Sequence, residues 1–431
     1  MRVLWFSTNS ANYKFPYANS KGYNGGGWTS SLQKEITKRS DIELGVCFCH
    51  NGLPAKEKQD EVVYYPVPHH KKIFRDKVLD IIHYNDVHRD EILWPYYINQ
   101  FKKVIEDFKP DVIEVFGSEL YIGLATIAAK GFPVILHLQG LLSLSIYAFF
   151  PPGVSQLQYI WKNKSVKKAY ANVQNLIYWK RSCHREKEIL KATPYVIGRT
   201  EWDKAAMQIL APQAQYYYGG EILRPEFYEF SKRHVPNKVV ITTTISNPPY
   251  KGFDLVLKTA YILKNEISLD FKWNVFGNVS PKFWEKHTGI NHNDVNVYLC
   301  GVASAQVLRE SLLQSTLYFH PSYVENSPNS VAEAQILGTP VVATNVGGTS
   351  SMIEHNNTGL LFPATDPYMG VSCILNIIEG PDWGAKIGNA AKEKAILRHD
   401  KKKIIEELIT TYNQIIQKNG ETNKSRCSLS I

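Results

Sequence analysis

The sequence predicts an α/β protein of two domains, each a parallel β-sheet doubly wound by helices. The chain has 431 residues, which is too long for one ordinary core, so two domains of roughly 200 residues each are expected. Short apolar runs alternate with helical patterns in the first half, and a second, independent alternation starts after Pro236. Such alternation is typical of parallel strands covered by helices.

In the first half, the short apolar runs predict the strands and the 3.6-residue patterns predict the helices. Strands are expected over 3–7, 44–49, 112–116, 134–138 and 195–198, and helices over 28–39, 99–108, 120–130 and 202–210. The section 66–95 fits this alternation poorly, so we expect an insertion there. The first domain is expected to cover residues 1–230.

The second half repeats the pattern and is expected to form a domain over 231–395. Its strands are predicted over 239–245, 273–277, 297–300, 317–320 and 341–344, and its helices over 253–263, 305–315 and 330–337. The stretch 221–236 is polar and aromatic, with prolines near both ends, and is expected to be the linker. From about Tyr368 the pattern is helical to the end, and 419–431 has little to bury, so a disordered tail is expected. Ligands of open α/β sheets bind beyond the carboxyl ends of the strands. A substrate held by both predicted domains is therefore expected in a cleft between them.

The composition is that of a globular chain, 44% hydrophobic and 21% charged. Its longest apolar stretch, 141–150, is interrupted by serines and is shorter than the roughly 20 residues of a membrane helix. No signal peptide is expected, because the first apolar run ends almost at once in polar residues. The six cysteines lack the spacing of a zinc site, and we expect a reducing compartment without disulfides. The expected location is cytoplasmic, either free or peripheral on the inner face of the membrane.

The net charge of +9 is concentrated in the stretch 160–191, where aromatic residues are interleaved with the basic ones. A solvated helix face explains this equally well, but an anionic partner is the functional interpretation. No nucleic-acid motif is present, so an anionic membrane surface or a pyrophosphate lipid ranks above DNA or RNA. The neighbouring stretch 141–150 fits either a lipid interface or a core.

Two glutamates, Glu325 and Glu333, flank a predicted helix start near Pro328. The backbone N–H groups of Asn329, Ser330 and Val331 would lie at its positive end, where phosphate oxygens bind well. Glu333 would follow one turn later. A loop carboxylate, an anion-binding helix start and a second carboxylate together predict a pocket for a molecule that carries hydroxyls and phosphates, such as a nucleotide sugar.

The stretch from His320 to Phe362 resembles the donor-binding signature of the retaining glycosyltransferases of family 4, whose fold is the two-domain GT-B type. The resemblance rests on ordered features: Pro321-Ser322, the E-x7-E pair Glu325 and Glu333, Ala334, the run Gly338-Thr339-Pro340-Val341-Val342-Ala343, and Gly347-Gly348. It implies two Rossmann-like domains facing each other across a cleft. It also implies that Glu333 holds the ribose hydroxyls, that Glu325 holds the donor sugar, and that a late helix, here 396–418, packs back on the first domain.

Further residues match positions that the resemblance makes functional. Gly26 and Gly27 match the glycine-rich loop near the donor phosphates, and His137 matches a histidine at a strand end that faces the reacting sugar. Lys251 matches the lysine that neutralises the diphosphate. The family has an arginine several residues earlier, whereas this chain reads Thr244-Ile-Ser-Asn-Pro-Pro-Tyr250 and lacks it. The leaving-group charge must then be met by Lys251 with helix N–H groups, or by a basic residue elsewhere.

The resemblance implies retaining transfer of a sugar from a nucleoside diphosphate donor to a hydroxyl of a saccharide or lipid-linked saccharide, in surface polysaccharide biosynthesis. His137, Glu325 and Lys251 are the expected catalytic residues. The chain has no D-x-D motif, so neither a metal nor another cofactor is expected. One alternative is a GT-B nucleotide-sugar epimerase. Another is a non-catalytic relative that binds nucleotide sugars or glycans. The sequence does not identify the base, the sugar or the acceptor.

Overall fold

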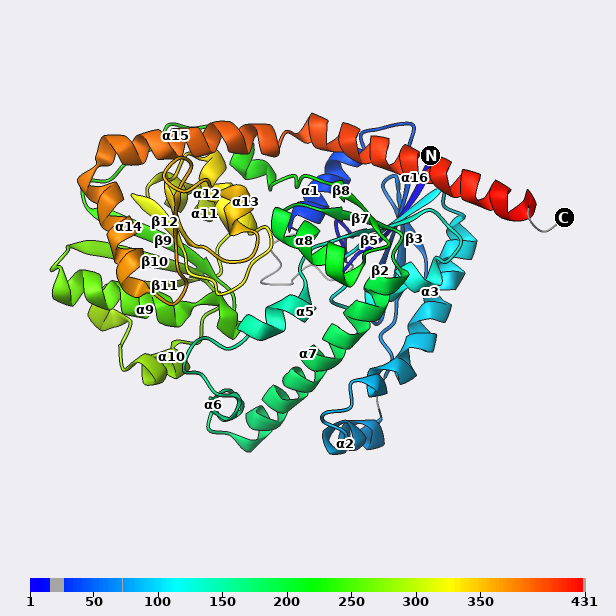
Figure 1. The fold of residues 1–431 in the computed structure, drawn as a ribbon, viewed down its shortest axis with the longest axis horizontal. Coiled ribbons are helices and arrows are strands. Elements are labelled where there is room, and N and C mark those ends of the chain that lie inside the picture. Colours follow the sequence, from blue (N-terminus) through cyan, green and yellow to red (C-terminus); the bar gives the residue numbers. More distant parts are fainter. Residues whose placement is uncertain (16–26, 72, 429–431) are drawn as a thin grey trace. The chain divides into compact units, whose positions relative to one another are not determined.

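A computed structural model describes residues 1–15, 27–71 and 73–428, and for 422–428 it describes the backbone only. The chain forms two compact units (Figure 1). Unit 1 comprises Met1–Ile146, Val173–Ile222 and Asp400–Ile431, and unit 2 comprises Tyr147–Asn172 and Leu223–His399. Each unit contains its own parallel sheet, so the predicted α/β class is confirmed.

Unit 1 contains an eight-stranded sheet of order β3-β4-β2-β1-β5-β6-β7-β8. All neighbours are parallel except β3 and β4, which pair antiparallel. The strands are β1 (Arg2–Phe6), β2 (Glu43–Cys49), β3 (Glu57–Gln59), β4 (Val62–Val67), β5 (Val112–Phe116), β6 (Val134–His137), β7 (Tyr195–Gly198) and β8 (Gln215–Tyr218). The strand order reverses between β1 and β5, and open α/β sheets bind ligands at the carboxyl ends of strands near such a point.

The helices of unit 1 pack on both faces of this sheet. They are α1 (Gly27–Ile36), α2 (Phe74–Ile82), α3 (Trp94–Phe108), α4 (Ala125–Ala128), α5 (Leu142–Ser145), most of α7 (Val166–Ala192), α8 (Glu201–Leu210) and α16 (Lys401–Ser428). The 3-10 helices η1 (His88–Leu93) and η2 (Tyr121–Leu124) precede α3 and α4. Phe101, Phe108 and Ile189 are among the side chains that bury one face in an apolar core. On α16, Tyr412 receives a hydrogen bond from the indole of Trp5 in β1, with Nε1 3.0 Å from the hydroxyl.

Unit 2 contains a six-stranded parallel sheet of order β11-β10-β9-β12-β13-β14. Its strands are β9 (Val239–Ile245), β10 (Phe271–Gly277), β11 (Val297–Gly301), β12 (Leu317–His320), β13 (Val341–Thr344) and β14 (Leu360–Phe362). Its helices are α6 (Gln156–Ile160), α9 (Phe253–Tyr261), α10 (Pro281–Thr288), α11 (Ala305–Leu313), α12 (Asn329–Ile336), α13 (Thr349–Met352), α14 (Pro367–Glu379) and α15 (Pro381–Arg398). The order reverses between β9 and β12, so the loops after these two strands mark the expected binding edge.

Two apolar cores cover the two faces of this second sheet. One joins side chains of α9 and α14, including Phe253 and Ile374, to the strands. The other joins α11 and α12 to Phe227 in the 3-10 helix η4 (Pro225–Tyr228). The stretch 221–236, predicted as a linker, therefore contributes to a core, because Phe227 is fully buried there.

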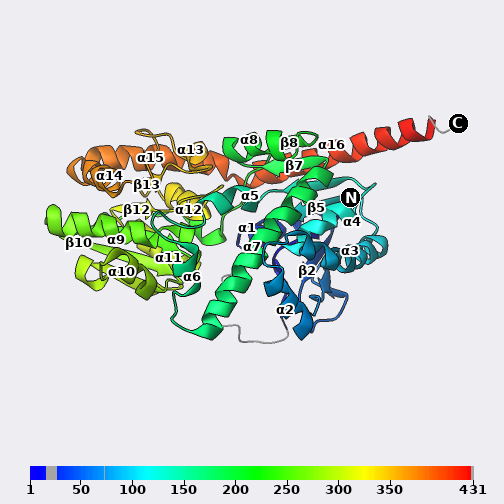
Figure 2. The same cartoon turned by 60° about the horizontal axis from the view of Figure 1, so that its bottom comes forward.

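The unit boundaries differ from the predicted ones in the first half of the chain. Residues 147–172 belong to unit 2 rather than to the predicted domain 1–230. The reason is apolar burial: Val154 lies in the core of unit 2 and Phe150 packs against it. The following residues form α7, one continuous helix of 27 residues (Figure 2). At the other end of the chain, α16 continues to Ser428, where the sequence predicts a disordered tail from 419.

Candidate active site

Lys251 and Glu325 form the central charge pair of unit 2. Lys251 ends a short 3-10 helix, Pro249–Lys251, in the loop after β9, and Glu325 lies in the loop after β12. Their side chains form a short ion pair. The Ser322 hydroxyl donates to Oε1 of Glu325 at 2.8 Å, and Nε2 of His320 lies 3.5 Å from the same oxygen. The pair therefore occupies the edge where the strand order reverses.

Two glycines let the loops of this site approach each other. Gly252 has φ +77°, and a Cβ there would lie 2.0 Å from the carbonyl oxygen of Pro321. Gly347 has φ +50°, and its Cβ would lie 1.9 Å from the carbonyl oxygen of Glu325. Tyr323 N–H also donates to Tyr250 O at 2.7 Å, which ties the Lys251 loop to the Glu325 loop. The backbone thus fixes both charged side chains, and only glycine permits this approach at positive φ.

Electrostatics keep the Glu325 carboxyl ionised. Burial alone would raise its pKa, but Lys251 and His320 outweigh burial and hold the pKa of Glu325 well below its usual range. For Lys251, burial acts in the opposite direction and lowers the pKa of the ammonium group. The Glu325 carboxylate outweighs this effect, so the pKa of Lys251 is raised. The site therefore presents a charged ammonium beside a charged carboxylate. Such a pair can meet a phosphate and a sugar hydroxyl at the same time.

Glu333 lies on α12, which begins at Asn329 after Pro328, as the sequence predicts. Its carboxylate is buried and is held by Arg224, whose Nε donates to Oε1 at 2.8 Å and whose Nη2 donates to Oε2 at 2.9 Å. Burial raises the pKa of Glu333, and the nearby Arg224 guanidinium opposes that rise. The N–H of Val331, one of the three predicted phosphate donors, donates to Pro328 O at 3.0 Å. The remaining two, Asn329 and Ser330, lie in the first turn of α12.

His137 ends β6 in unit 1, as predicted, and it is buried. Its Nδ1 lies 2.7 Å from Oε1 of Glu114, whose other oxygen accepts a short hydrogen bond from the Tyr412 hydroxyl. Because a carboxylate accepts, we assign the proton to Nδ1, which makes Nε2 an acceptor. Burial lowers the pKa of His137, although Glu114 opposes that effect, so the neutral imidazole is favoured.

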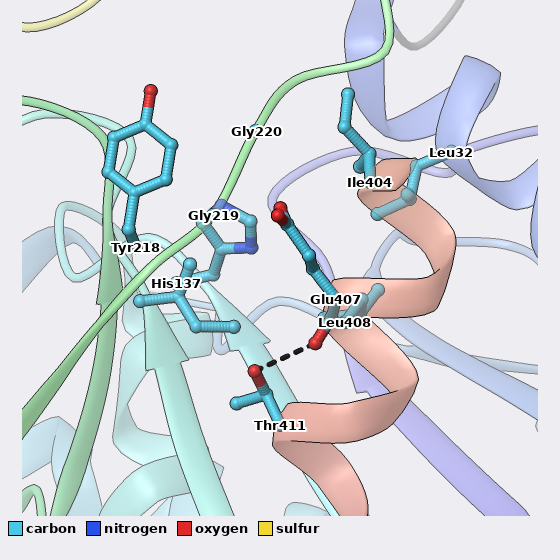
Figure 3. Close-up of a pocket in the computed structure, with 10 residues that line it drawn as sticks. Leu32, His137, Tyr218, Gly219, Gly220, Ile404, Glu407, Leu408 and Thr411 are labelled. Carbon is cyan, nitrogen blue, oxygen red and sulfur yellow. Dashed lines mark hydrogen bonds between the residues drawn. The ribbon is translucent and has the colours of Figure 1, made fainter. Parts of the chain in front are cut away.

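A pocket in unit 1 is lined by His137, Tyr218, Gly219 and residues of α16 that include Glu407 and Thr411. Figure 3 shows the His137 imidazole and the Glu407 carboxylate entering it from opposite sides. Among the described residues, Nε2 of His137 has no hydrogen-bond partner. An imidazole acceptor and a carboxylate in one pocket suit a ligand with several hydroxyl donors.

The two predicted glycines of unit 1 have different outcomes, and Arg199, which directly follows β7, makes only internal contacts among those described. Gly27 begins α1 with φ +59°, and a Cβ there would meet no atom within 4 Å. Gly26 lies outside the described residues. Arg199 is buried, forms an ion pair with Glu221 and donates to Leu138 O. It therefore acts as a structural contact in unit 1.

Sequence reasoning missed several residues of these sites. Arg224 gives no sequence signal, because it lies 109 positions from Glu333. Glu114 does give one: a carboxylate inside the apolar strand Val112–Phe116 requires a buried partner. His320 ends β12 just as His137 ends β6, and the same strand-end argument could have found it.

The comparisons with solved structures define the fold class. A sucrose-phosphate synthase from Thermosynechococcus elongatus matches with a TM-score of 0.70 and 15% identity, over 96% of this chain and 99% of that one. A HepE structure from Anabaena in complex with UDP and glucose matches with a TM-score of 0.61 and 16% identity, over 96% and 100%. The protein therefore has the α/β GT-B fold.

The comparison with protein families is more specific. Residues 236–379 match the sequence model of the family Glycosyl transferases group 1. This range lies within unit 2 and includes Lys251, Glu325 and Glu333. The family resemblance is confirmed over this range of unit 2.

Curated relatives support the same classification over limited lengths. A D-inositol 3-phosphate glycosyltransferase from Nocardioides sp. is 35% identical over 83 residues, which are 19% of this chain and 18% of the relative. The amylovoran biosynthesis glycosyltransferase AmsK from Erwinia amylovora is 24% identical over 183 residues, or 40% and 44% of the two chains. The chain thus spans less than half the length of either relative.

Proposed function

We propose that the protein transfers a sugar, with retention, from a nucleoside diphosphate sugar to a hydroxyl of a saccharide or lipid-linked saccharide in surface polysaccharide biosynthesis. The observation that carries this proposal is the Lys251–Glu325 pair at the edge where the strands of unit 2 reverse order. In the proposed complex, Glu325 holds hydroxyls of the donor sugar and Lys251 neutralises the diphosphate as it leaves. The similarity to AmsK, which is named for amylovoran biosynthesis, supports the polysaccharide role.

Arg224 is the proposed replacement for the arginine that the sequence lacks before Lys251. In the proposed complex, Glu333 accepts hydrogen bonds from the ribose hydroxyls. In the described structure, its two oxygens instead accept hydrogen bonds from Arg224. We propose that the ribose displaces the guanidinium, which then contributes its charge to the diphosphate. A planar guanidinium suits this role, because it can bind phosphate oxygens through two parallel hydrogen bonds.

Retention follows in this proposal from front-face attack, in which a donor phosphate oxygen takes the proton of the acceptor hydroxyl. The pocket lined by His137 and Glu407 is the proposed binding place for substrate hydroxyls on unit 1. Nε2 of His137 accepts a hydrogen bond from a substrate hydroxyl there, because Glu114 fixes the imidazole proton on Nδ1. No metal is assigned to the donor site, since Lys251 and Arg224 supply the positive charge.

A thermal-shift panel of UDP-, GDP- and ADP-sugars tests the donor site. UDP-glucose is the first probe, because the similar Anabaena structure is a complex with UDP and glucose. At least one nucleotide sugar is expected to stabilise the wild type, and Glu333→Ala is expected to abolish that shift. Glu310→Ala is the control, because this glutamate is exposed on the same unit. A wild type that no nucleotide sugar stabilises would refute the donor site.

The products distinguish the proposed transfer from its alternatives. A donor together with a saccharide acceptor should yield a new α-linked product when the donor sugar is α-linked. Formation of a new nucleotide sugar from the donor alone would identify an epimerase. Binding without turnover across all acceptors would identify a non-catalytic relative, and the occupation of Glu333 by Arg224 gives that alternative its support.

An anionic membrane is the proposed surface partner, although fewer cations are available than the composition implies. Arg181 and Arg185 are buried in ion pairs with Asp80 and Asp90. The lysines that remain exposed at the start of α7 adjoin exposed apolar side chains, as at Val166, Lys167 and Lys168. No helix in the described part of the chain is long and apolar enough to span a membrane. Cosedimentation with anionic but not neutral vesicles, lost in Lys167→Glu/Lys168→Glu, is the expected result.

A further inference from the structure

Two histidines and a glutamate of unit 1 converge outside the sites described above. His88 and Glu91 lie on η1, and His184 lies on α7. Nδ1 of His88 and Nε2 of His184 are each 2.7 Å from Oε1 of Glu91. All three potential ligand atoms lie within 4.8 Å of one another. The sequence does not reveal this group, because 93 positions separate Glu91 from His184.

Buried contacts fix the two elements that carry the group. Asp90 and Arg185, the neighbours of Glu91 and His184, form an ion pair of 2.6 Å, and both side chains are almost completely buried. Asp90 also accepts from the Tyr121 hydroxyl at 2.5 Å and from the Trp94 indole at 2.9 Å. The backbone positions of Glu91 and His184 are therefore set independently of any contact between their own side chains.

The three side chains differ in their exposure to solvent. The ring of His184 stacks on Trp94 with centroids 5.8 Å apart, and its side chain is only 15% exposed. Glu91 is 44% exposed and His88 is 70% exposed. The cluster thus has one well-oriented imidazole at its base and two ligands that open to solvent, which gives an ion a route of entry.

The donor set is that of a divalent transition metal. Two imidazole nitrogens and a carboxylate oxygen are common zinc ligands, with bonds of about 2.0–2.2 Å and tetrahedral geometry. Tetrahedral bonds of that length place ligand atoms roughly 3.3 Å apart. The two nitrogen–oxygen distances of 2.7 Å need to widen by only about 0.6 Å. Small rotations of the exposed His88 and Glu91 side chains can provide this change.

We propose that His88, Glu91 and His184 bind one zinc ion with a water in the fourth position. The ion joins η1 to α7 and thereby anchors the segment between α2 and α3, which the sequence marks as an insertion. The Asp90–Arg185 ion pair already holds η1 against α7. The zinc ion would add a second link between the same two helices. The role is structural, and the ion takes no part in the proposed sugar transfer.

Zinc binding by the full chain is measured by competition with a chromophoric chelator after metal removal. The wild type is expected to bind one ion per chain. Loss of an outer-shell partner typically costs about tenfold to hundredfold in metal affinity, so His88→Ala and His184→Ala should cost at least as much. His292→Ala is the matched control, because His292 pairs with Glu285 at 2.6 Å but belongs to no three-ligand group in the described chain.

Cobalt substitution gives a second readout that reports coordination directly. The wild type loaded with Co²⁺ should show the visible absorption of a tetrahedral site, and His88→Ala should lose it. His88 is 70% exposed, so this variant is expected to fold normally, and its metal-free unfolding midpoint should equal that of the wild type. Absence of a bound ion would overturn the proposal. Equal binding by the wild type and both histidine variants would also overturn it and would indicate an adventitious ion only.

Discussion

Arg224 donates two parallel hydrogen bonds to Glu333, from Nε to Oε1 at 2.8 Å and from Nη2 to Oε2 at 2.9 Å. The two side chains are unequally buried, with 18% of Arg224 and 6% of Glu333 exposed. The carboxylate therefore depends on the guanidinium for charge compensation more than the guanidinium depends on the carboxylate. In the proposed function, the ribose must therefore replace the charge compensation that Arg224 gives to Glu333.

Arg224→Ala is expected to lower the free energy of unfolding by about 3 kcal/mol, because it leaves a buried carboxylate without its partner. Glu333→Gln should cost less, since the remaining Arg224 can turn toward solvent. Denaturant unfolding measures both changes. Arg2→Ala is the control: its ion pair with Glu43 is exposed on both sides, and its loss should cost less than about 1 kcal/mol. Equal effects of Arg224→Ala and Arg2→Ala would contradict the asymmetry.

Lys251→Gln is expected to reverse the pH dependence that Glu325 gives to stability. In the wild type, the lowered pKa of Glu325 makes its contribution complete above the ordinary value of 4.5. That contribution is lost as the pH falls below this value. Without Lys251, burial dominates and raises the pKa, so stability should instead decline as the pH rises through the new pKa.

The measurement for Lys251→Gln is the difference in melting temperature from the wild type, followed from about pH 4 to about pH 8. The difference should grow with pH. Lys238→Gln is the control, because the Lys238–Asp270 pair is exposed, and its difference should stay flat. A flat profile for Lys251→Gln as well would show that Lys251 does not control the ionisation of Glu325.

The sequence predicts the central strands well, and the reason is physical. The predicted bounds 112–116, 195–198, 239–245, 317–320 and 341–344 equal those of β5, β7, β9, β12 and β13. Strands buried on both faces of a parallel sheet are nearly continuous apolar runs, and their ends are therefore visible in the sequence. The strands β3 and β14, by contrast, lie at sheet edges and have only three residues each, which is too short for a recognisable pattern.

The sites are predicted in part, and the limit is sequence distance. Glu325 and Lys251 are found as separate residues through the family resemblance, and the structure adds the contact between them. The partners of Glu333 and Glu114 come from distant segments: Arg224 lies 109 positions away from Glu333, and Tyr412 lies 298 positions away from Glu114. Such contacts leave no local pattern, because each partner is an ordinary residue in its own segment.

Tyr412→Phe is expected to destabilise unit 1 by roughly 2 kcal/mol, because it removes one hydroxyl that serves two buried groups. Trp5 Nε1 loses its acceptor and Glu114 loses a donor, and all three side chains are buried. The midpoint of urea unfolding measures the loss. Tyr218→Phe is the control, since Tyr218 is 57% exposed. If both variants unfold at the wild-type midpoint, the hydroxyl of Tyr412 does not anchor α16.

Gly347→Ala is expected to disrupt the donor site through the backbone of Glu325. The new Cβ would lie 1.9 Å from the carbonyl oxygen of Glu325, so the turn or the Glu325 loop must move. Gly289→Ala separates this clash from conformational strain, because Gly289 also has a positive φ, +74°, but no atom lies near its Cβ position. Gly289→Ala should therefore cost only about 1 kcal/mol.

The two alanine variants should also differ in donor binding. Movement of Glu325 breaks its contacts with Lys251 and Ser322, so Gly347→Ala should lose the thermal shift that a nucleotide sugar gives the wild type. Gly289→Ala should retain it. Retention of the shift by Gly347→Ala would mean that donor binding tolerates displacement of Glu325, and the sugar-binding role proposed for this carboxylate would then be wrong.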